Sequence, residues 1–268
     1  MTAAPSAPPC PILVINLDSS TSRLESVTRQ LHAAGFTFER LPAVDGRLLP
    51  EGEVARLCPD NSRHFYSPLS RGEVGCSLSH IRALRTMLDR GLDRCVVFED
   101  DFELRPGFAR CLHELLALGD RLPEAVKMYG RRSRGEVIAT LPGGDRLVRS
   151  NSPPICSTCT LWTDRGARKL LAASSRILRP IDVQVKHWWE MDLDVAWVSP
   201  PPVIDCTELM QRSTIGDRRA QGVARLLSQL RYRWGYAAAR QWHCLRIGGP
   251  ARWFRALTRV PGPAHRTP

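Results

Sequence analysis

Short apolar runs and helically spaced apolar stripes alternate along the N-terminal part of the chain. Residues 11–17 (PILVINL) are apolar and rich in β-branched side chains, a pattern typical of a buried strand. Apolar residues then recur at helical spacing across residues 22–34, and Gly35 ends this predicted helix. Residues 36–41 predict a second strand. A strand, a helix and a strand of this length form a βαβ unit, which favours a parallel sheet.

The same helix-then-strand order follows further along the chain. Ser70 and Glu73 fit a capping box, in which a hydroxyl at the start of a helix is paired with a Glu three residues later. Apolar residues within 74–88 then lie three or four positions apart, as on one face of a helix. Gly91 ends this helix, and residues 95–98 predict the next strand. The N-terminal part therefore predicts an α/β fold with a mostly parallel sheet flanked by helices.

Three acids follow the predicted strand at residues 95–98 without any spacer: Glu99, Asp100 and Asp101. Ionised carboxylates are costly to bury, so the strand should end here and present them at the sheet edge where open α/β sheets bind ligands. Three adjacent acids repel one another unless a cation neutralises them. One interpretation is a divalent metal ion that holds a phosphorylated substrate. A solvated acidic turn is the other interpretation, and these residues alone leave both open.

The remaining pattern is weaker. Residues 160–163 and 195–198 predict strands, and residues 164–173 predict a helix. Residues 47–68 contain several Pro and Gly and predict irregular structure. Residues 131–151 are polar with glycines, and we expect a mobile loop there.

Composition changes this picture little. The chain has 268 residues, of which 43% are hydrophobic and 24% charged, as in ordinary soluble globular proteins. No apolar run approaches the ~20 residues that a transmembrane helix needs. Residues 1–9 are rich in Ala and Pro without a basic side chain, which predicts a short disordered leader. The nine cysteines show no zinc-ribbon spacing and suit a reducing, cytoplasmic location.

The net charge of +11 is unevenly distributed. Residues 218–268 contain eleven arginines and no acid, so residues 1–217 are neutral. This division predicts one domain over residues 10–217 and a basic helical tail over residues 218–268. Aromatic residues are interleaved with the arginines, a combination that suits an anionic membrane surface. A solvated helical hairpin is the alternative, and we expect no nucleic acid partner because no nucleic-acid-binding motif is present.

A series of motifs follows along the chain: VINLDSSTSR (14–23), FERLPAVDG (38–46), GEVGCSLSHIRAL (72–84), VVFEDD (96–101), TLWTDRGARKLL (160–171), RPIDVQV (179–185) and QRSTI (211–215). In this order and spacing they resemble a known family, glycosyltransferase family 25 of the lipooligosaccharide galactosyltransferase type. The resemblance implies a nucleotide-sugar transferase with a GT-A-like, Rossmann-type sheet. Residues 10–217 would then be the glycosyltransferase domain. Glu99-x-Asp101 stands where that class has its Asp-x-Asp metal motif.

The resemblance implies a UDP-sugar donor, with UDP-galactose as the first choice. Mn²⁺ or Mg²⁺ would bridge the diphosphate and assist its departure, since these hard ions prefer oxygen ligands. We expect Glu99 and Asp101 to contact the metal or its waters. Asp100 would instead bind the ribose or the sugar.

Other candidate donor contacts lie at the ends of the first two predicted strands. Asn16 and Arg23 flank the first strand end, where an arginine can bind phosphate or ribose with two hydrogen bonds. A surface arginine on an amphipathic helix is the alternative. Asp45 and Gly46 fit a simple turn equally well as a contact of Asp45 with uracil or ribose.

The helix capped by Ser70 carries two further candidates. Ser79 belongs to a stripe of small residues whose plain interpretation is close packing of the helix on the sheet. His80 follows it, and the family motif ends in this Ser-His pair, so both are candidates for contact with the nucleotide or sugar. A structural role for the histidine stays equally open.

The acceptor side is predicted around Asp182. If the anomeric centre inverts, a base must deprotonate the acceptor hydroxyl, and Asp182 is our candidate. Capping of the next helix or turn explains Asp182 equally well. His187 and Trp188 could bind the acceptor sugar by stacking, and His187 could also be a third metal ligand. Core packing explains the neighbouring tryptophans just as well.

Together these observations predict a metal-dependent glycosyltransferase that moves a hexose, first of all galactose, from a UDP-sugar to a hydroxyl of a bacterial cell-envelope glycan such as lipooligosaccharide. Inversion is expected. The acceptor could be a lipid-linked oligosaccharide at the inner face of the cytoplasmic membrane, where the protein would be peripheral. A non-catalytic domain that binds nucleotide-sugar or glycan as an assembly factor is one alternative. A UDP-sugar phosphohydrolase is another.

Overall fold

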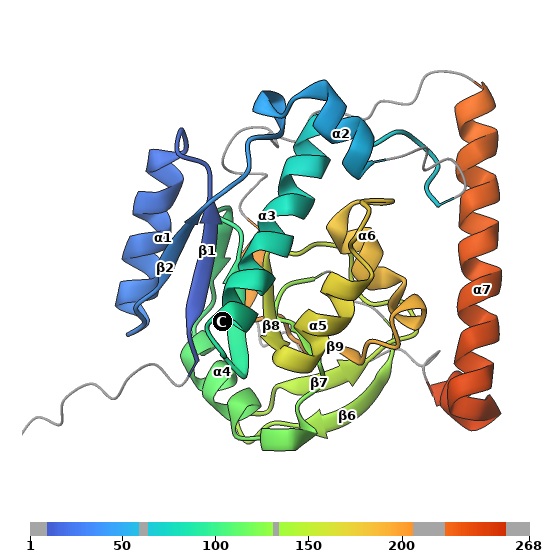
Figure 1. Cartoon of the computed structure of the whole chain (residues 1–268). Helices are drawn as coiled ribbons and strands as arrows, with labels where there is room; N and C mark the ends of the chain where they lie inside the picture. Colours follow the sequence, from blue (N-terminus) through green and yellow to red (C-terminus); the bar gives the residue numbers. More distant parts are fainter. Residues whose placement is uncertain (1–9, 59–63, 131–133, 206–222, 256–268) are drawn as a thin grey trace, which may run out of the picture.

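One large sheet organises the chain. The computed structural model describes residues 10–58, 64–130, 134–205 and 223–255. Its main sheet has eight strands, shown in Figure 1. In spatial order they are β2 (Glu39–Pro42), β1 (Ile12–Asn16), β3 (Arg94–Phe98), β8 (Cys159–Thr163), β5 (Ala125–Lys127), β9 (Val195–Ser199), β7 (Arg146–Arg149) and β6 (Glu136–Thr140). A separate antiparallel pair joins β4 (Phe102–Leu104) to β10 (Val203–Asp205).

Strand direction confirms the mostly parallel sheet. β1 is parallel to both β2 and β3, and β5 is parallel to β9. β8 is antiparallel to β3 and β5, and β7 is antiparallel to β9 and β6. Only β8 and β7 therefore run against the other strands of this sheet. The carboxyl ends of β1, β3 and β5 consequently meet one edge, together with the start of β8.

Helices cover both faces of the sheet. α1 (Thr21–Ala33) and α4 (Phe108–Leu116) pack on one face. α3 (Arg71–Asp89), α5 (Asp164–Ala172) and α6 (Ile181–Lys186) pack on the opposite face. The predicted capping box is confirmed, because the Ser70 hydroxyl accepts from the Glu73 amide while the Glu73 carboxylate accepts from the Ser70 amide. The α/β fold expected from the sequence is thus confirmed.

Two expectations were wrong. Part of the expected loop at residues 131–151 is a hairpin of β6 and β7 that extends the sheet, with Leu147 and Val148 buried. Gly143 and Gly144 lie in its turn, where Gly144 has a φ of 88°, whereas Gly135 directly precedes β6. The region 47–68 is likewise not wholly irregular, since it includes α2 (Glu51–Leu57) and follows a 3₁₀ turn that begins at Gly46.

The boundaries of the second strand also differ. Residues 36–41 were expected to form it, but β2 comprises Glu39–Pro42. Phe36 instead places its ring 5.6 Å from that of Phe108 and is buried in the core. Phe36 therefore belongs to the turn that joins α1 to β2.

The C-terminal helix α7 (Val223–Arg255) stands along one side of the molecule in Figure 1, with a break at Gly249. Among the described residues, no helix combines the length and apolarity that crossing a bilayer would require. The predicted leader 1–9, the boundary at 217 and 218, the motif 211–215 and residues 256–268 lie outside the described residues.

Candidate active site

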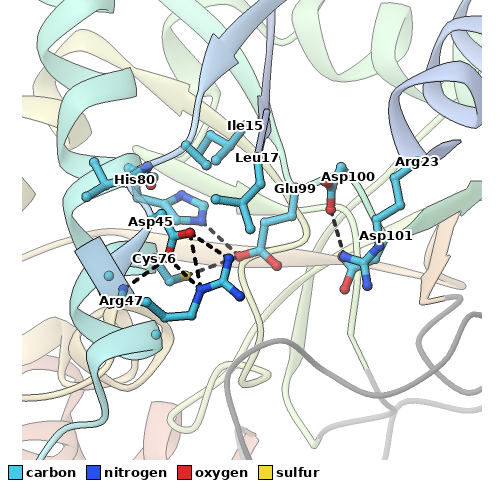
Figure 2. A pocket seen from close by; sticks show the side chains of 15 residues that line it. Ile15, Leu17, Arg23, Asp45, Arg47, Cys76, His80, Glu99, Asp100 and Asp101 are labelled. Carbon is cyan, nitrogen blue, oxygen red and sulfur yellow. Dashed lines mark hydrogen bonds and ion pairs between the residues drawn. The ribbon is translucent and has the colours of Figure 1, made fainter. Parts of the chain in front are cut away.

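A cavity of about 120 Å³ opens at the carboxyl ends of β1 and β3 (Figure 2). Its walls come from the β1–α1 and β2–α2 connections, from α3 and from the segment after β3. Many of the site residues predicted from the sequence line this cavity: Arg23, Asp45, Gly46, Ser79, His80, Glu99, Asp100 and Asp101. The structure therefore brings most of the predicted donor and metal residues to one place.

Asp100 connects β3 to β1 and α1. Val14 pairs with Phe98 in the parallel register, so two residues further on Asn16 lies beside Asp100. The Asn16 amide donates to one oxygen of Asp100 at 2.7 Å, and Arg23 Nη1 donates to the other at 3.0 Å. Arg40 Nε in turn donates to Asn16 Oδ1 at 2.9 Å. The Arg23–Asp100 pair is only 15% and 10% exposed, so water screens it less than a surface pair.

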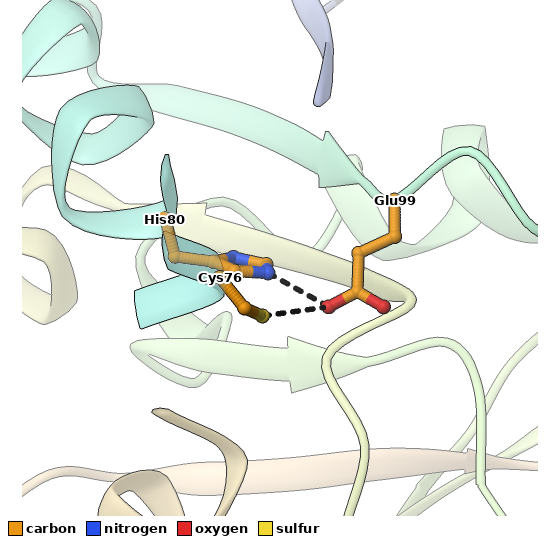
Figure 3. Close-up of side chains that lie close together, drawn as sticks. All are labelled: Cys76, His80 and Glu99. Atoms are coloured by element: carbon orange, nitrogen blue, oxygen red, sulfur yellow. Dashed lines mark hydrogen bonds and ion pairs between the residues drawn. The ribbon is translucent and has the colours of Figure 1, made fainter. Parts of the chain in front are cut away.

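Glu99 faces α3 instead. Its Oε1 lies 2.9 Å from His80 Nε2 and accepts a weaker bond from Cys76 Sγ at 3.8 Å, as Figure 3 shows. Cys76 and His80 are four residues apart, so they lie on the same face of the helix. Burial raises the pKa of the Cys76 thiol well above its usual range, and Glu99 raises it further. Cys76 is therefore a neutral donor here.

The residues around Glu99 fit a divalent cation by their chemistry. The sulfur of Cys76, the Nε2 of His80 and a carboxylate oxygen of Glu99 all lie within 4.8 Å of one another. Asp101 lines the same cavity and adds a second carboxylate. Carboxylates suit Mg²⁺ and Mn²⁺, whereas a thiol and an imidazole favour softer ions such as Zn²⁺. Asp100 is a weaker candidate because Asn16 and Arg23 engage both its oxygens.

Asp45 has a local partner. Its carboxylate accepts from the Arg47 amide at 3.0 Å and from Arg47 Nη2 at 2.6 Å. These hydrogen bonds from Arg47 hold the pKa of Asp45 below its usual range. The residue therefore presents a stable negative charge at the cavity wall, beside an arginine that is itself 70% exposed.

The cavity wall depends on close backbone contact between α3 and residues 44–46. A Cβ on Gly46 would lie 1.8 Å from the carbonyl oxygen of Arg71, and one on Gly75 would lie 2.5 Å from that of Val44. The Ser79 hydroxyl accepts from the Val44 amide at 2.8 Å and donates to the Gly75 carbonyl at 2.7 Å. Ser79 and Gly46 thus shape the wall, in agreement with the packing interpretation of the small-residue stripe.

Asp182 lies at the start of α6 and lines a different cavity of about 530 Å³ between α6 and α7. Its Oδ1 accepts from the Val183 amide at 2.7 Å, which agrees with the interpretation as a helix-start residue. Burial raises the pKa of Asp182, and Lys127 opposes this rise. Because Glu99 and His80 also influence this pKa, Asp182 lies within electrostatic reach of the Glu99 cavity.

Lys127 is a candidate that the sequence analysis missed. It ends β5, is 1% exposed and donates from Nζ to the Cys156 carbonyl at 2.6 Å. Burial lowers the pKa of Lys127, while Asp182 and Glu99 act to raise it. A lysine at the end of a short apolar run is the same signal as the acids after β3. It could therefore have been noticed in the sequence.

His187 and Trp188 do not line the Glu99 cavity. His187 bonds through Nδ1 to the Val183 carbonyl at 2.8 Å, and its ring lies 5.0 Å from that of Tyr236 on α7. Burial lowers the pKa of His187 to about 4. Trp188 donates from Nε1 to the Asn151 carbonyl at 3.3 Å and lines a third cavity of about 290 Å³. These contacts favour the packing interpretation of both residues.

Comparison with known proteins identifies the family. Residues 10–131 match the model of glycosyltransferase family 25 (LPS biosynthesis protein). This stretch contains β1, β2, α3, β3 and every residue that lines the Glu99 cavity. Over residues 10–131 the chain therefore has the sequence of a glycosyltransferase family 25 protein.

Several animal members of family 25 are similar to the chain over more than this stretch. A glycosyltransferase 25 family member of Anopheles gambiae is 30% identical over 200 residues, which is 70% of this chain and 33% of that protein. Procollagen galactosyltransferase 1-A of Xenopus laevis is 31% identical over 187 residues, 64% of this chain and 30% of that protein. A probable inactive family member 3 of Bos taurus is 28% identical over 216 residues, 70% of this chain and 35% of that protein. The chain spans about a third of the length of these relatives.

Proposed function

We propose that this family 25 protein is a glycosyltransferase that moves a hexose, first of all galactose, from a UDP-sugar to a hydroxyl of a glycan. One observation carries the proposal. The three acids after β3 converge with Arg23 and His80 in a single cavity, and that cavity lies within the residues that match the family. The choice of galactose is supported by relatives whose names contain galactosyltransferase.

The donor would bind at the end of β1 and β3. Arg23 is already held by Asp100, so its guanidinium is positioned before a phosphate or ribose arrives, which lowers the ordering cost of binding. Asn16 fixes the other oxygen of Asp100 and completes this unit. Asp45 lies at the opposite wall, where its carboxylate can accept hydrogen bonds from ribose hydroxyls or from uracil.

Glu99 and Asp101 would hold Mn²⁺ or Mg²⁺, which when bound neutralises charge on the diphosphate leaving group. His80 contributes by orienting Glu99, because its ring nitrogen lies 2.9 Å from one carboxylate oxygen. The second oxygen of Glu99 then points away from α3 (Figure 3). We therefore propose that sugar transfer requires a divalent metal ion.

Asp182 would remove the proton from the acceptor hydroxyl. Burial raises its pKa, which makes the carboxylate a stronger base, while the positive charge of Lys127 opposes that rise. Attack on an α-linked donor from the opposite face would invert the anomeric centre. Tyr232 and Tyr236 line the Asp182 cavity and offer ring faces for the acceptor sugar. His187 and Trp188 would support this wall from behind.

The acceptor we propose is a cell-envelope glycan such as lipooligosaccharide, reached at the inner face of the cytoplasmic membrane. The family description as LPS biosynthesis proteins supports this choice. The names of the procollagen galactosyltransferases state a different acceptor for those proteins. A protein acceptor is therefore the natural second substrate to assay.

A second candidate function is non-catalytic binding of a nucleotide-sugar or glycan. It is favoured by the relatives from Bos taurus and Mus musculus, whose names call them probable inactive or inactive family members. The complete acid cluster of this chain argues against it, because binding alone does not require three carboxylates.

A panel of UDP-sugars tests these alternatives. The protein is incubated with each donor, with lipooligosaccharide or procollagen peptide, and with Mn²⁺, Mg²⁺ or a chelator. We expect UDP release from UDP-galactose that requires both an acceptor and a divalent ion. Donor binding by calorimetry without turnover would favour the binding function. Release of UMP and sugar 1-phosphate without any acceptor would favour a phosphohydrolase.

A further inference from the structure

The two faces of α7 differ in what they contact. One face packs on the body of the protein, where the rings of Tyr232, Tyr236 and His243 meet those of His187 and Trp189. The opposite face is apolar, and its large side chains are exposed in the part of the chain that the structure describes. We call it the outer face of α7, and it consists of Leu227, Leu230, Trp234, Trp242 and Leu245, which are 60%, 42%, 75%, 66% and 42% exposed.

Helical geometry places these five residues together. They lie three, four, eight and three positions apart, so all fall on one side of a helix with 3.6 residues per turn. Figure 1 shows the part of α7 before its break at Gly249 as a straight helix along one side of the molecule, so the outer face forms a nearly linear strip. Large exposed apolar strips of this kind mark interaction surfaces.

The charge beside this strip indicates the kind of partner. Arg231 and Arg246 are exposed, and helical spacing places Arg231 within the strip and Arg246 next to one edge of it. The helix contains no Asp, Glu or Lys, and the whole stretch 218–268 carries eleven arginines and no acid. A partner with an apolar interior and a negatively charged surface could contact the apolar side chains and the arginines at the same time. Tryptophan, leucine and arginine at such a position suit the interface of an anionic bilayer.

We propose that the outer face of α7 docks on an anionic lipid bilayer, with the helix lying in the plane of the interface. The helix is not apolar enough to span a membrane, so it would lie on the surface. Only the benefit of docking rests on the proposed function, and membrane binding itself does not. Because the inner side of α7 lines the Asp182 cavity, docking would bring a lipid-linked acceptor close to the proposed base.

Vesicle co-sedimentation tests the proposal with the full chain and without donor or metal. The vesicles contain phosphatidylcholine alone or phosphatidylcholine with phosphatidylglycerol. Wild type should bind the anionic vesicles and lose this binding as salt is raised. Arg231→Gln with Arg246→Gln should lower the partition coefficient roughly thirtyfold, because each cation near such a surface contributes about a fivefold gain. Trp234→Ser with Trp242→Ser should reduce binding at low salt as well.

Matched controls remove the same groups elsewhere. Arg29→Gln with Arg85→Gln takes two exposed arginines from α1 and α3, and Val137→Ser takes an exposed apolar side chain from β6. Both controls should bind vesicles as wild type does. Circular dichroism should show that all variants fold, because every altered side chain is exposed.

Other outcomes would overturn the proposal. Equal binding of all variants, or no binding of wild type to anionic vesicles, excludes the outer face as a membrane site. A wild-type dimer in light scattering that Trp234→Ser with Trp242→Ser converts to a monomer, without vesicle binding, would assign the face to a second copy of the chain. Because no turnover is measured, a failed transferase assay would leave the vesicle result unaffected.

Discussion

The two halves of the proposed site are built in different ways. On the donor side, hydrogen bonds between side chains join Asp100 to both β1 and α1, and α3 touches the loop at residues 44–46 backbone to backbone. On the acceptor side, Asp182 lies in a cavity whose far wall is a single helix. That helix is held mainly by contacts between aromatic rings.

This contrast between hydrogen bonds and ring contacts indicates how one fold can bind one substrate of constant structure and another whose structure varies. Directional hydrogen bonds specify a single geometry, which suits a nucleotide diphosphate of constant shape. Ring contacts tolerate rotation and sliding, so a wall of this kind can change with the acceptor. The family match agrees with this division, because it ends at residue 131 and does not include Asp182 or α7.

The largest expected effect is on the donor side. Asp101→Asn keeps the shape of the side chain but removes the charge proposed to bind the metal. We expect kcat/KM to fall roughly 10³-fold, because a metal at the leaving group supplies several kcal/mol of transition-state stabilisation. Steady-state UDP release measures this. Asp89→Asn, at the exposed end of α3, should retain full activity. Normal turnover by Asp101→Asn would remove the metal role of this residue.

Asp182→Asn tests the acceptor side separately. General base catalysis typically contributes 10²–10⁴-fold, so kcat should fall roughly 10²- to 10³-fold. The KM for the UDP-sugar should stay unchanged because Asp182 lies outside the donor cavity. Asp192→Asn is the control, since its side chain is 90% exposed and asparagine tolerates the φ of 50° there. A loss confined to donor affinity would contradict the proposed base.

The rigidity of the donor side can be tested at Gly75. Its Cβ in Gly75→Ala would lie 2.5 Å from the Val44 carbonyl, so α3 must move away from the loop. We expect the free energy of unfolding to fall by about 1–3 kcal/mol, and the KM for the donor to rise. Urea denaturation measures the first effect. Gly52→Ala is the matched control because a Cβ there meets nothing within 4 Å. Unchanged stability would show that this contact is looser than proposed.

The smallest effect concerns Lys127 and the pH dependence of kcat. The pKa of Asp182 is raised by burial, so activity should fall as pH drops through that raised value. Lys127→Met removes the cation that opposes the rise, and the acidic limb should therefore move to higher pH. Activity on the acidic limb should therefore fall, while activity at higher pH, where Asp182 is ionised in both proteins, should change little.

Two further variants complete this comparison. Lys127→Arg should restore most of the wild-type profile because it keeps the charge. Lys169→Met, which removes a partly exposed lysine paired with Glu124, should not shift the profile. A uniform loss of activity at all pH values in Lys127→Met would indicate a structural role only.

Local signals explain which parts the sequence could predict. The helix that Ser70 caps, the strand before Glu99 and the helix after Ser20 each depend on neighbouring residues, and the structure contains all three. The convergence of Asp100 with Asn16 follows from parallel pairing of β1 with β3. These elements could be predicted because each one is specified by its own composition and spacing.

The parts that were missed depend on distant partners. Lys127 donates to a carbonyl 29 residues further along the chain, so the residues next to it in the sequence do not show what surrounds its side chain. The sequence favours a loop where β6 and β7 form a hairpin, because the turn glycines are a stronger local signal than two short strands. The aromatic packing of His187 against α7 likewise depends on a helix more than thirty residues further along the chain.

The reversed direction of β8 has a mechanical consequence. Because this strand runs against β3 and β5, the main chain that enters it arrives at the edge where those two strands leave. There the Thr158 carbonyl accepts from the Glu99 amide at 2.9 Å, and the Cys156 carbonyl accepts from Lys127 at 2.6 Å. The backbone of residues 156–158 is thus hydrogen-bonded at one end to Glu99, on the proposed donor side, and at the other end to Lys127, beside the proposed acceptor side. A displacement of Glu99 would therefore pull on the same stretch of main chain that holds Lys127, so the two proposed halves of the site are mechanically coupled through covalent bonds.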